Sequence, residues 1–130
     1  MKAVFQAIYD KVHAAIVAQG KGSMNGSSCV YRAHNGSKCA VGHLLSNEQM
    51  TKYNISESMM PPSFSPELLQ ELAPGAREND IVRFLNKLQS AHDEAAFSSE
   101  HDPSAFLSKF KEEMNTVADT FGLVPIKEST

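Results

Sequence analysis

The sequence lacks several features that would point to a particular class of protein. Its 130 residues include no tryptophan, only two cysteines and no low-complexity tract. No stretch approaches the roughly 18 uncharged apolar residues that a membrane-spanning helix needs. Gln6 and Asp10 interrupt the apolar residues at the start, so no signal peptide is predicted there. We therefore expect a protein of the cytoplasm whose cysteines are free thiols.

The chain also lacks a strong charge of either sign. It has 12 basic and 15 acidic residues, a formal net charge of -3 and no long run of one sign. Binding to duplex nucleic acid needs a basic stripe, and a mimic of nucleic acid needs dense carboxylates, so both classes are excluded. The apolar content of 42% and charged content of 21% are those of an ordinary globular protein. Residues 1–130 are predicted to form a single domain.

Helical periodicity predicts three long helices, over residues 3–18 and 79–96 and from the N-cap Asp102 to the end signal at Gly122. Glycines at positions 20 and 22 end the first helix, and Gly122 ends the last. Two shorter helices are predicted from their start signals. Ser46 to Gln49 has the form of a capping box, and Ser65 is followed by a proline at the first helical position.

A β-hairpin is predicted between the first helix and the rest of the chain. Asn35-Gly36 is a strong signal for a two-residue hairpin turn, because both residues tolerate a positive φ. The turn lies between a strand over 29–33 and a return strand over 38–41. The expected fold class is therefore α+β and mostly helical, with three long and two or three short helices packed on one small hairpin.

The register of this hairpin places Arg32 opposite Cys39 and Cys29 opposite Gly42. The two cysteines then face opposite sides of the strand pair. A disulfide between them, or a zinc ion held by both, would need the hairpin to slip by one residue. The spacing of the cysteines and His43 also matches no common zinc site, so no metal and no cofactor are predicted.

Arg32 beside Cys39 suggests a nucleophilic thiol. A guanidinium lowers the pKa of a neighbouring thiol, and the N-terminal amides of a helix that begins after Cys39 act in the same direction. His92 lies on the apolar face of its helix and is the candidate base. Asp93 follows it, but adjacent helical residues are about 100° apart, so we expect the carboxylate to be poorly placed to orient the ring.

The same residues also have plainer interpretations. Cys39 can be a small buried hydrophobe, and His92 can be an inward histidine whose hydrogen bonds are satisfied. Arg32 can anchor the hairpin by binding carbonyls, and Tyr31 is expected to pack on the first helix. His43 is expected to face solvent.

An anion is a further candidate ligand. Arg32, Lys38 and the backbone around Gly42 would lie at the entrance of a helix, where anions bind well. The sequence has no Walker pattern and no Gly-x-Gly-x-x-Gly, so a nucleotide is not specified.

Two blocks of sequence resemble a known group of proteins. The first is Cys29-x-Tyr31-Arg32-x-x-x-Gly36-x-Lys38-Cys39-Ala40-Val41-Gly42-x-Leu44, and the second is Leu88-Gln89-x-Ala91-His92-Asp93. In pattern, order and separation they are similar to blocks of small uncharacterised proteins of tailed phages and prophages. The resemblance implies expression inside an infected bacterium and a role in host interaction or anti-defence. It implies no particular chemistry.

Three functions stay open at this point. The first is a phage-type accessory protein that binds a host protein or a small anionic ligand without catalysis. Its candidate binding residues are Tyr31, Arg32, Lys38, Gly42 and Asp93. The second is a cysteine-dependent hydrolase or transferase with Cys39 as nucleophile and His92 as base. The third is a structural or assembly role. No membrane or duplex nucleic acid is expected as a partner, and the oligomeric state is open.

Overall fold

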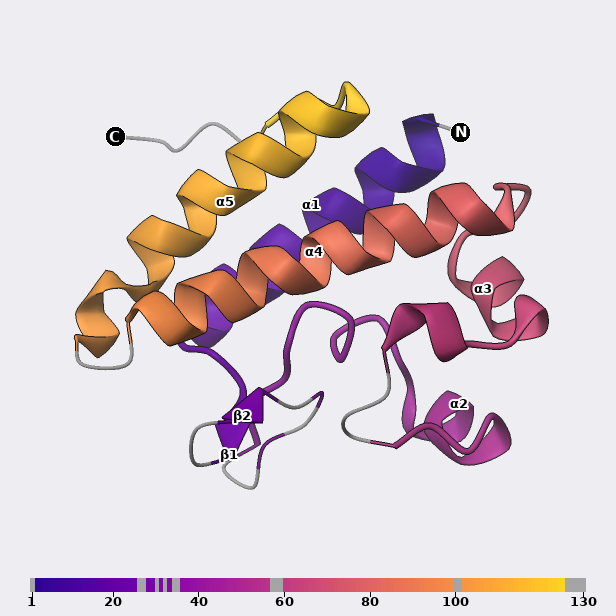
Figure 1. Cartoon of the computed structure of the whole chain (residues 1–130), viewed down its shortest axis with the longest axis horizontal. Helices are drawn as coiled ribbons and strands as arrows, with labels where there is room; N and C mark the ends of the chain where they lie inside the picture. The colour runs from indigo at the N-terminus through magenta and orange to yellow at the C-terminus, as the bar shows by residue number, and fades with distance from the viewer. Residues whose placement is uncertain are drawn as a thin grey trace.

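Three long helices form the main layer of the molecule. The structure is a computed structural model that describes residues 2–25, 28–29, 31, 33, 36–56, 60–99 and 102–125. The long helices are α1 (Lys2–Gln19), α4 (Glu78–Ser98) and α5 (Phe106–Phe121). In Figure 1, α4 and α5 run across the front of the molecule and α1 lies behind α4. All three were predicted from helical periodicity and are confirmed.

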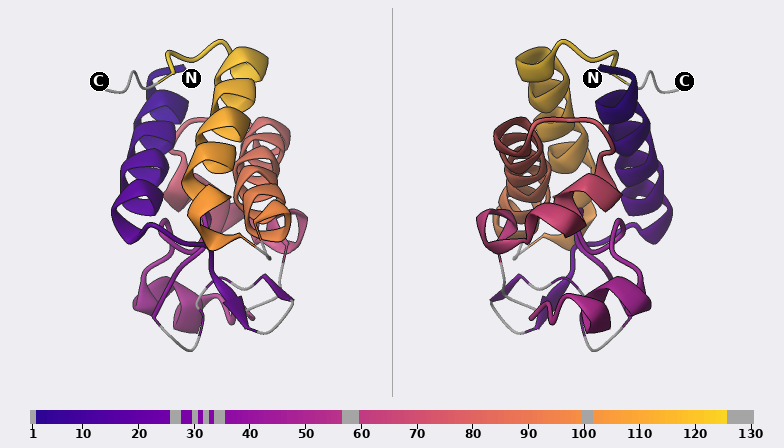
Figure 2. Two further views of the ribbon diagram at one scale, coloured as in Figure 1. Left: turned by 90° about the vertical axis from the view of Figure 1, so that its left-hand side faces the viewer. Right: turned by 90° about the vertical axis from the view of Figure 1, so that its right-hand side faces the viewer.

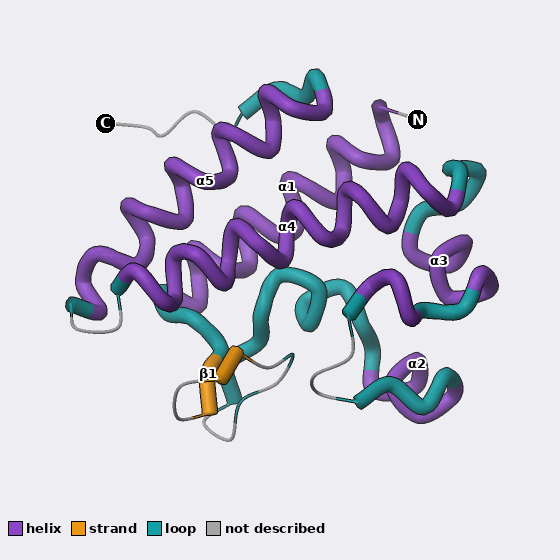
Figure 3. The backbone as a smooth tube through the Cα atoms, viewed as in Figure 1, coloured by secondary structure: helices purple, strands orange, loops and turns teal. Residues whose placement is uncertain are grey.

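The shorter elements lie together on one side of this layer, as both views in Figure 2 show. They are β1 (Met24–Asn25), β2 (Ser28–Cys29), α2 (Asn47–Lys52), the 3-10 helix η1 (Pro61–Ser63) and α3 (Pro66–Leu72). A second 3-10 helix, η2 (Pro103–Ala105), leads into α5. Figure 3 shows that most of the chain between α1 and α2 is loop. We refer to residues 20–45 as the motif loop, because they contain the first sequence block.

Local capping explains where several helices begin and end. The hydroxyl of Ser46 accepts from the Gln49 N–H, and the Gln49 side chain accepts from the Ser46 N–H, which is the predicted capping box. The hydroxyl of Ser65 accepts from the Leu68 N–H and caps α3 without a reciprocal bond. Gly122 ends α5 with a left-handed φ of 67°. The predicted N-cap Asp102 precedes a helical turn, but that turn is the 3-10 helix η2 and α5 begins only at Phe106.

Aromatic rings join the three long helices. The rings of Phe5 in α1 and Phe84 in α4 stack with their centroids 4.4 Å apart. Phe121 in α5 meets Phe84 edge-on at 5.1 Å. The Tyr9 hydroxyl donates to the Met114 carbonyl at 3.1 Å and ties α1 to α5. The apolar faces that the periodicity predicted are therefore the faces that pack together.

The predicted α+β class is wrong, because the fold is all-α. Among the described residues, the one two-stranded ladder pairs two residues on each side, with Met24 opposite Cys29 and Asn25 opposite Ser28. Cys29 therefore pairs with Met24 and not with Gly42. The Cys39 N–H still donates to the Tyr31 carbonyl at 3.2 Å, but residues 40–44 form a helical turn instead of a return strand, because the His43 N–H donates to the Cys39 carbonyl at 3.0 Å.

A tight turn does form near the predicted Asn-Gly position, but it closes in a different register. Gly36 has a φ of 90°, and its N–H donates to the Ala33 carbonyl at 3.0 Å. The Ala33 N–H donates to the Ser37 carbonyl at 2.8 Å, where Lys38 was predicted to be its partner. A three-residue loop thus replaces the two-residue loop, and this shifts the register by one residue. Arg32 and Asn35 lie outside the described residues, so the predicted pairing of Arg32 with Cys39 is not placed.

No helix in the described part of the chain has both the length and the apolar character needed to cross a membrane.

Candidate functional site

The two sequence blocks meet in the structure. The Val41 N–H in the motif loop donates to the side-chain oxygen of Gln89 in α4 at 3.2 Å. The Ser23 N–H at the start of the loop donates to Nε2 of His92 at 2.9 Å. Gln89 and His92 lie one turn apart on α4, so both present their polar atoms to the same loop. We refer to the side chains of Gln19, Gln89, His92 and Asp93 as the polar clamp.

The imidazole of His92 is fully buried and both of its nitrogens have partners. A backbone N–H can only donate, so Nε2 is the acceptor from Ser23 and carries no proton. The proton of the neutral ring is then on Nδ1, which lies 2.9 Å from Oδ1 of Asp93. Gln89 donates to the same carboxylate oxygen at 2.9 Å. His92 therefore has no free nitrogen with which to act as a base.

The expectation that Asp93 is poorly placed to orient the His92 ring is wrong. The two side chains start about 100° apart around the helix, but that angle describes only the Cα–Cβ directions. The ring and the carboxylate extend beyond Cβ and converge at 2.9 Å. The Asp93 side chain is 27% exposed, so the carboxylate joins the buried ring to the surface.

Cys39 is a buried thiol with a strongly raised pKa. Its sulfur accepts the Gly42 N–H at 3.3 Å, which is the expected effect of a helical turn that begins after the cysteine. That hydrogen bond lowers the thiol pKa, but burial is the larger influence and raises it from 9.0 to about 12. The thiolate needed for nucleophilic attack is therefore scarce at neutral pH.

Gln19 holds the other side of the motif loop to the end of α1. Its side chain accepts from the Lys38 N–H and donates to the Lys38 carbonyl, both at 2.8 Å. The same amide donates to the Lys21 carbonyl at 2.6 Å. The oxygen of Gln19 also lies 3.1 Å from Nε2 of His43. One glutamine thus fixes the backbone on which the Lys38 side chain is carried.

Tyr31 and Gly42 are buried parts of this assembly. The Tyr31 side chain is 3% exposed, and its ring lies 6.2 Å from that of Phe64, so it packs beside η1. The α hydrogen of Gly42 faces the Tyr31 carbonyl so closely that a Cβ there would lie 2.2 Å from its oxygen. The Gly42 N–H is already used by the Cys39 sulfur. Both residues were predicted to bind a ligand, but both are buried and neither offers a surface to one.

Lys11, Lys38 and His43 form a small basic cluster. His43 is half-buried, although it was expected to face solvent. Burial lowers its pKa from 6.5 to about 4, and the nearby charges of Lys38 and Lys11 act in the same direction. The ring is therefore neutral at neutral pH. Within the described part of the chain, neither lysine forms an ion pair with a carboxylate.

A cleft of about 230 Å³ adjoins the basic cluster. It lies between α1, the end of the motif loop, α2 and α3, and it is lined by Ala7, Ile8, Lys11, Leu44, Gln49, Glu71 and Leu72. Lys11 belongs to both features, and Leu44 follows His43 in the chain. The right-hand view of Figure 2 shows the side of the molecule on which α1, α2 and α3 come together.

Some of the residues in this region were not predicted from the sequence. Gln19 and Gln89 were given no role, and Lys11 was not considered. A signal was available for Gln89, because a glutamine and a histidine three residues apart flank the apolar face of α4. Buried polar groups of this kind need specific partners. No local signal identifies Gln19 or Lys11, since their neighbours come from distant parts of the chain.

No protein-family model, curated protein or solved structure matches the chain. Over the residues that the structure describes, no three His, Cys, Asp or Glu side chains gather in a way that could hold a metal ion. The function is therefore inferred from the arrangement of the chain's own side chains.

Proposed function

We propose that this chain is a small non-enzymatic binding protein that recognises an anionic group at the basic cluster. The anionic group belongs to a host protein or to a small ligand. The observation that carries the proposal is that Lys11 and Lys38 act together on His43 and have no carboxylate partner among the described residues. Such a cluster is notable on a chain whose net charge is -3.

The fate of the candidate catalytic residues supports the same proposal. The thiol of Cys39 is buried with a pKa of about 12, and both nitrogens of His92 are occupied. These groups hold the motif loop to α4 and are not available to a substrate. The clamp in turn fixes the backbone of Lys38 through Gln19. The polar side chains of the two blocks thus serve to position the motif loop on α4.

The resemblance to phage proteins provides the biological setting of the proposal. A small protein expressed in an infected bacterium acts most simply by binding a host component. Host takeover and anti-defence are the roles that fit this setting. A purely structural or assembly role is the competing function, and it predicts no specific ligand at the basic cluster.

The experiment is an NMR titration of the labelled protein with two anions, inorganic phosphate and a tetraglutamate peptide, at low salt. We expect saturable shifts of the backbone amides of Lys38, His43 and Leu44. Replacing Lys11 or Lys38 with glutamine should weaken binding by about two- to fivefold each, as expected for one exposed ion pair. Lys87→Gln is the matched control, because Lys87 is an exposed lysine in the middle of α4. Shifts that do not saturate, or an equal loss in the control, would overturn the proposal.

A further inference from the structure

The lining of the cleft beside Lys11 indicates what kind of anionic partner it accepts. Four of its residues are apolar and come from three separate parts of the chain: Ala7 and Ile8 of α1, Leu44 of the motif loop and Leu72 of α3. The volume of about 230 Å³ is below the range of about 300–1,000 Å³ that is usual for sites of drug-sized ligands. The cleft is therefore of a size for one aliphatic side chain.

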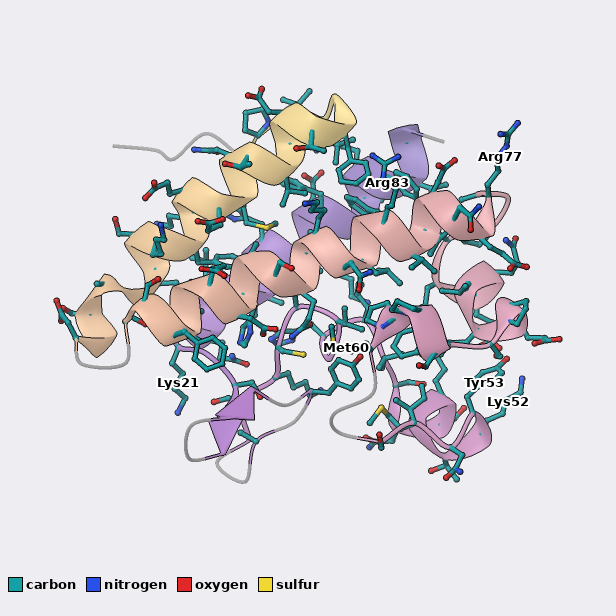
Figure 4. All side chains as sticks on the ribbon, in the orientation of Figure 1. Lys21, Lys52, Tyr53, Met60, Arg77 and Arg83 are labelled. Atoms are coloured by element: carbon teal, nitrogen blue, oxygen red, sulfur yellow. The ribbon has the colours of Figure 1, made fainter. Side chains whose placement is uncertain are left out.

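Two of the polar lining residues are already satisfied. Glu71 accepts hydrogen bonds from Gln49, Lys52 and Tyr53, and the last two reach it from the end of α2 (Figure 4). Gln49 uses its nitrogen for Glu71 and its oxygen for the Ser46 N–H. The carboxylate of Glu71 lines the cleft, but it is already held by a lysine and two neutral donors. It offers little to a ligand in the cleft.

Lys11 is the polar lining residue that keeps its charge available. Within the described residues its ammonium group makes no hydrogen bond or ion pair, and its charge is near enough to His43 to act on that ring. A ligand that fills the cleft with an apolar group can therefore place a carboxylate at Lys11. A polyanion without an apolar group would leave the cleft empty. The lining therefore favours a ligand that carries both an apolar group and a carboxylate.

We infer that the cleft binds the aliphatic side chain of an acidic peptide segment of the partner protein, with a neighbouring carboxylate of that segment at Lys11. This inference rests on the proposed function and specifies the partner. An aliphatic anchor in a pocket supplies affinity, and the adjoining charges supply orientation. Lys38, whose charge acts on His43 together with that of Lys11, supplies a second positive charge for a further acidic residue of the segment.

The test compares two labelled peptides by fluorescence anisotropy. One is acetyl-Glu-Glu-Leu-Glu-Glu-amide, and in the other serine replaces the leucine. We expect the leucine peptide to bind about tenfold more tightly, because it buries most of one aliphatic side chain. If neither peptide binds, the proposed function fails. If both bind equally well, the proposed function stands and the inference about the cleft is overturned.

The position of the anchor is tested by filling the cleft. Ala7 is an exposed helical residue that lines the cleft, so Ala7→Leu keeps a strong helix former and adds three side-chain carbons to the cleft without a buried polar change. In this variant we expect the leucine and serine peptides to bind with nearly equal affinity. Ala14→Leu is the matched control, since Ala14 is exposed on the same helix and does not line the cleft. The Ala14→Leu variant should still bind the leucine peptide about tenfold more tightly than the serine peptide.

Two further results would overturn the inference. An unchanged preference in Ala7→Leu would place the anchor elsewhere on the protein. Binding of hexanoate at least as tightly as the leucine peptide would show that the cleft serves a small carboxylate and not a peptide segment. The thermal unfolding of Ala7→Leu and Ala14→Leu is measured as well. If their midpoints are unchanged, a loss of the preference for the leucine peptide is caused by the filled cleft.

Discussion

The layer of three long helices and the motif loop are held in place by different kinds of interaction. In the helical layer, apolar faces and rings pack together, as with Phe5 against Phe84 at 4.4 Å. In the motif loop, the side chains of Gln19, Gln89 and His92 bind backbone groups directly. Apolar packing tolerates substitution by similar shapes, whereas a side chain bound to a buried backbone group has few substitutes. The loop is therefore the more specific and the more fragile part of the fold.

The largest expected effect concerns the reactivity of Cys39. In a Cys29→Ser background at pH 8, iodoacetamide should alkylate Cys39 roughly a thousandfold more slowly than in the urea-unfolded chain, because burial raises the thiol pKa from 9.0 to about 12. The rate is measured by mass spectrometry over time. If the loop opened independently of the helical layer, alkylation would be much faster than global unfolding allows, and the description of a firmly held loop would fail.

Removal of the His92 side chain should be as costly as removal of a core leucine. His92→Ala leaves the Ser23 N–H without its acceptor, removes one of the two donors to Asp93 and opens a cavity, so we expect a loss of about 3 to 5 kcal/mol in the free energy of unfolding. Leu88→Ala, one turn away on the same helix, is the comparison. Urea unfolding of both variants gives the values. A loss below about 1 kcal/mol for His92→Ala would contradict the role of the clamp.

Two glycines of the motif loop should differ in their response to alanine. A Cβ at Gly42 would lie 2.2 Å from a backbone oxygen, so the turn must move, and we expect a loss of about 2 to 3 kcal/mol. A Cβ at Gly22 would lie 2.9 Å from the Ala96 side chain. There the loop can shift slightly from α4, and about 1 kcal/mol is expected. Thermal or urea unfolding ranks them, and the reverse order would contradict the described contact between the turn and Tyr31.

The smallest expected effect is a dependence of stability on the titration of His43. The folded pKa of about 4 lies below the unfolded value of 6.5, so the unfolded chain binds the proton more readily. The contribution is fully present above pH 6.5 and is lost as the pH falls toward 4. We expect roughly 1 to 2 kcal/mol, less than the full shift implies, because the ring is half exposed. His43→Gln should flatten this part of the stability curve, and an unchanged curve would count against the burial of the ring.

The elements that could be predicted from the sequence are those whose causes are local. The capping box at Ser46, the proline after Ser65 and the glycine after α5 each act within one turn of the helix they begin or end. The apolar faces of the long helices repeat at a period that the sequence displays directly. These predictions needed no knowledge of what lies on the other side of the core.

The hairpin could not be predicted correctly, because the loop that forms in its place is held by residues far away in the sequence. The Asn-Gly signal indicated a turn, but Gly36 closes a loop that is one residue longer. The Cys39 N–H still donates to the Tyr31 carbonyl, but Gln19 and Gln89 satisfy the N–H groups of Lys38 and Val41, so the pairing does not continue into a full return strand. A pattern of neighbouring residues contains no information about a glutamine 48 positions away. The same holds for the meeting of Lys11 with Lys38 and His43.

The most direct test of the account is the tautomer of His92, observed by long-range ¹H–¹⁵N NMR of the imidazole rings at neutral pH. The geometry predicts a proton on Nδ1, shared with Asp93, and a nitrogen without a proton at Nε2, where the Ser23 N–H donates. His92→Ala identifies the signal if that variant folds, and selective labelling identifies it otherwise. A proton on Nε2 would contradict the clamp, since Ser23 could then no longer donate to it.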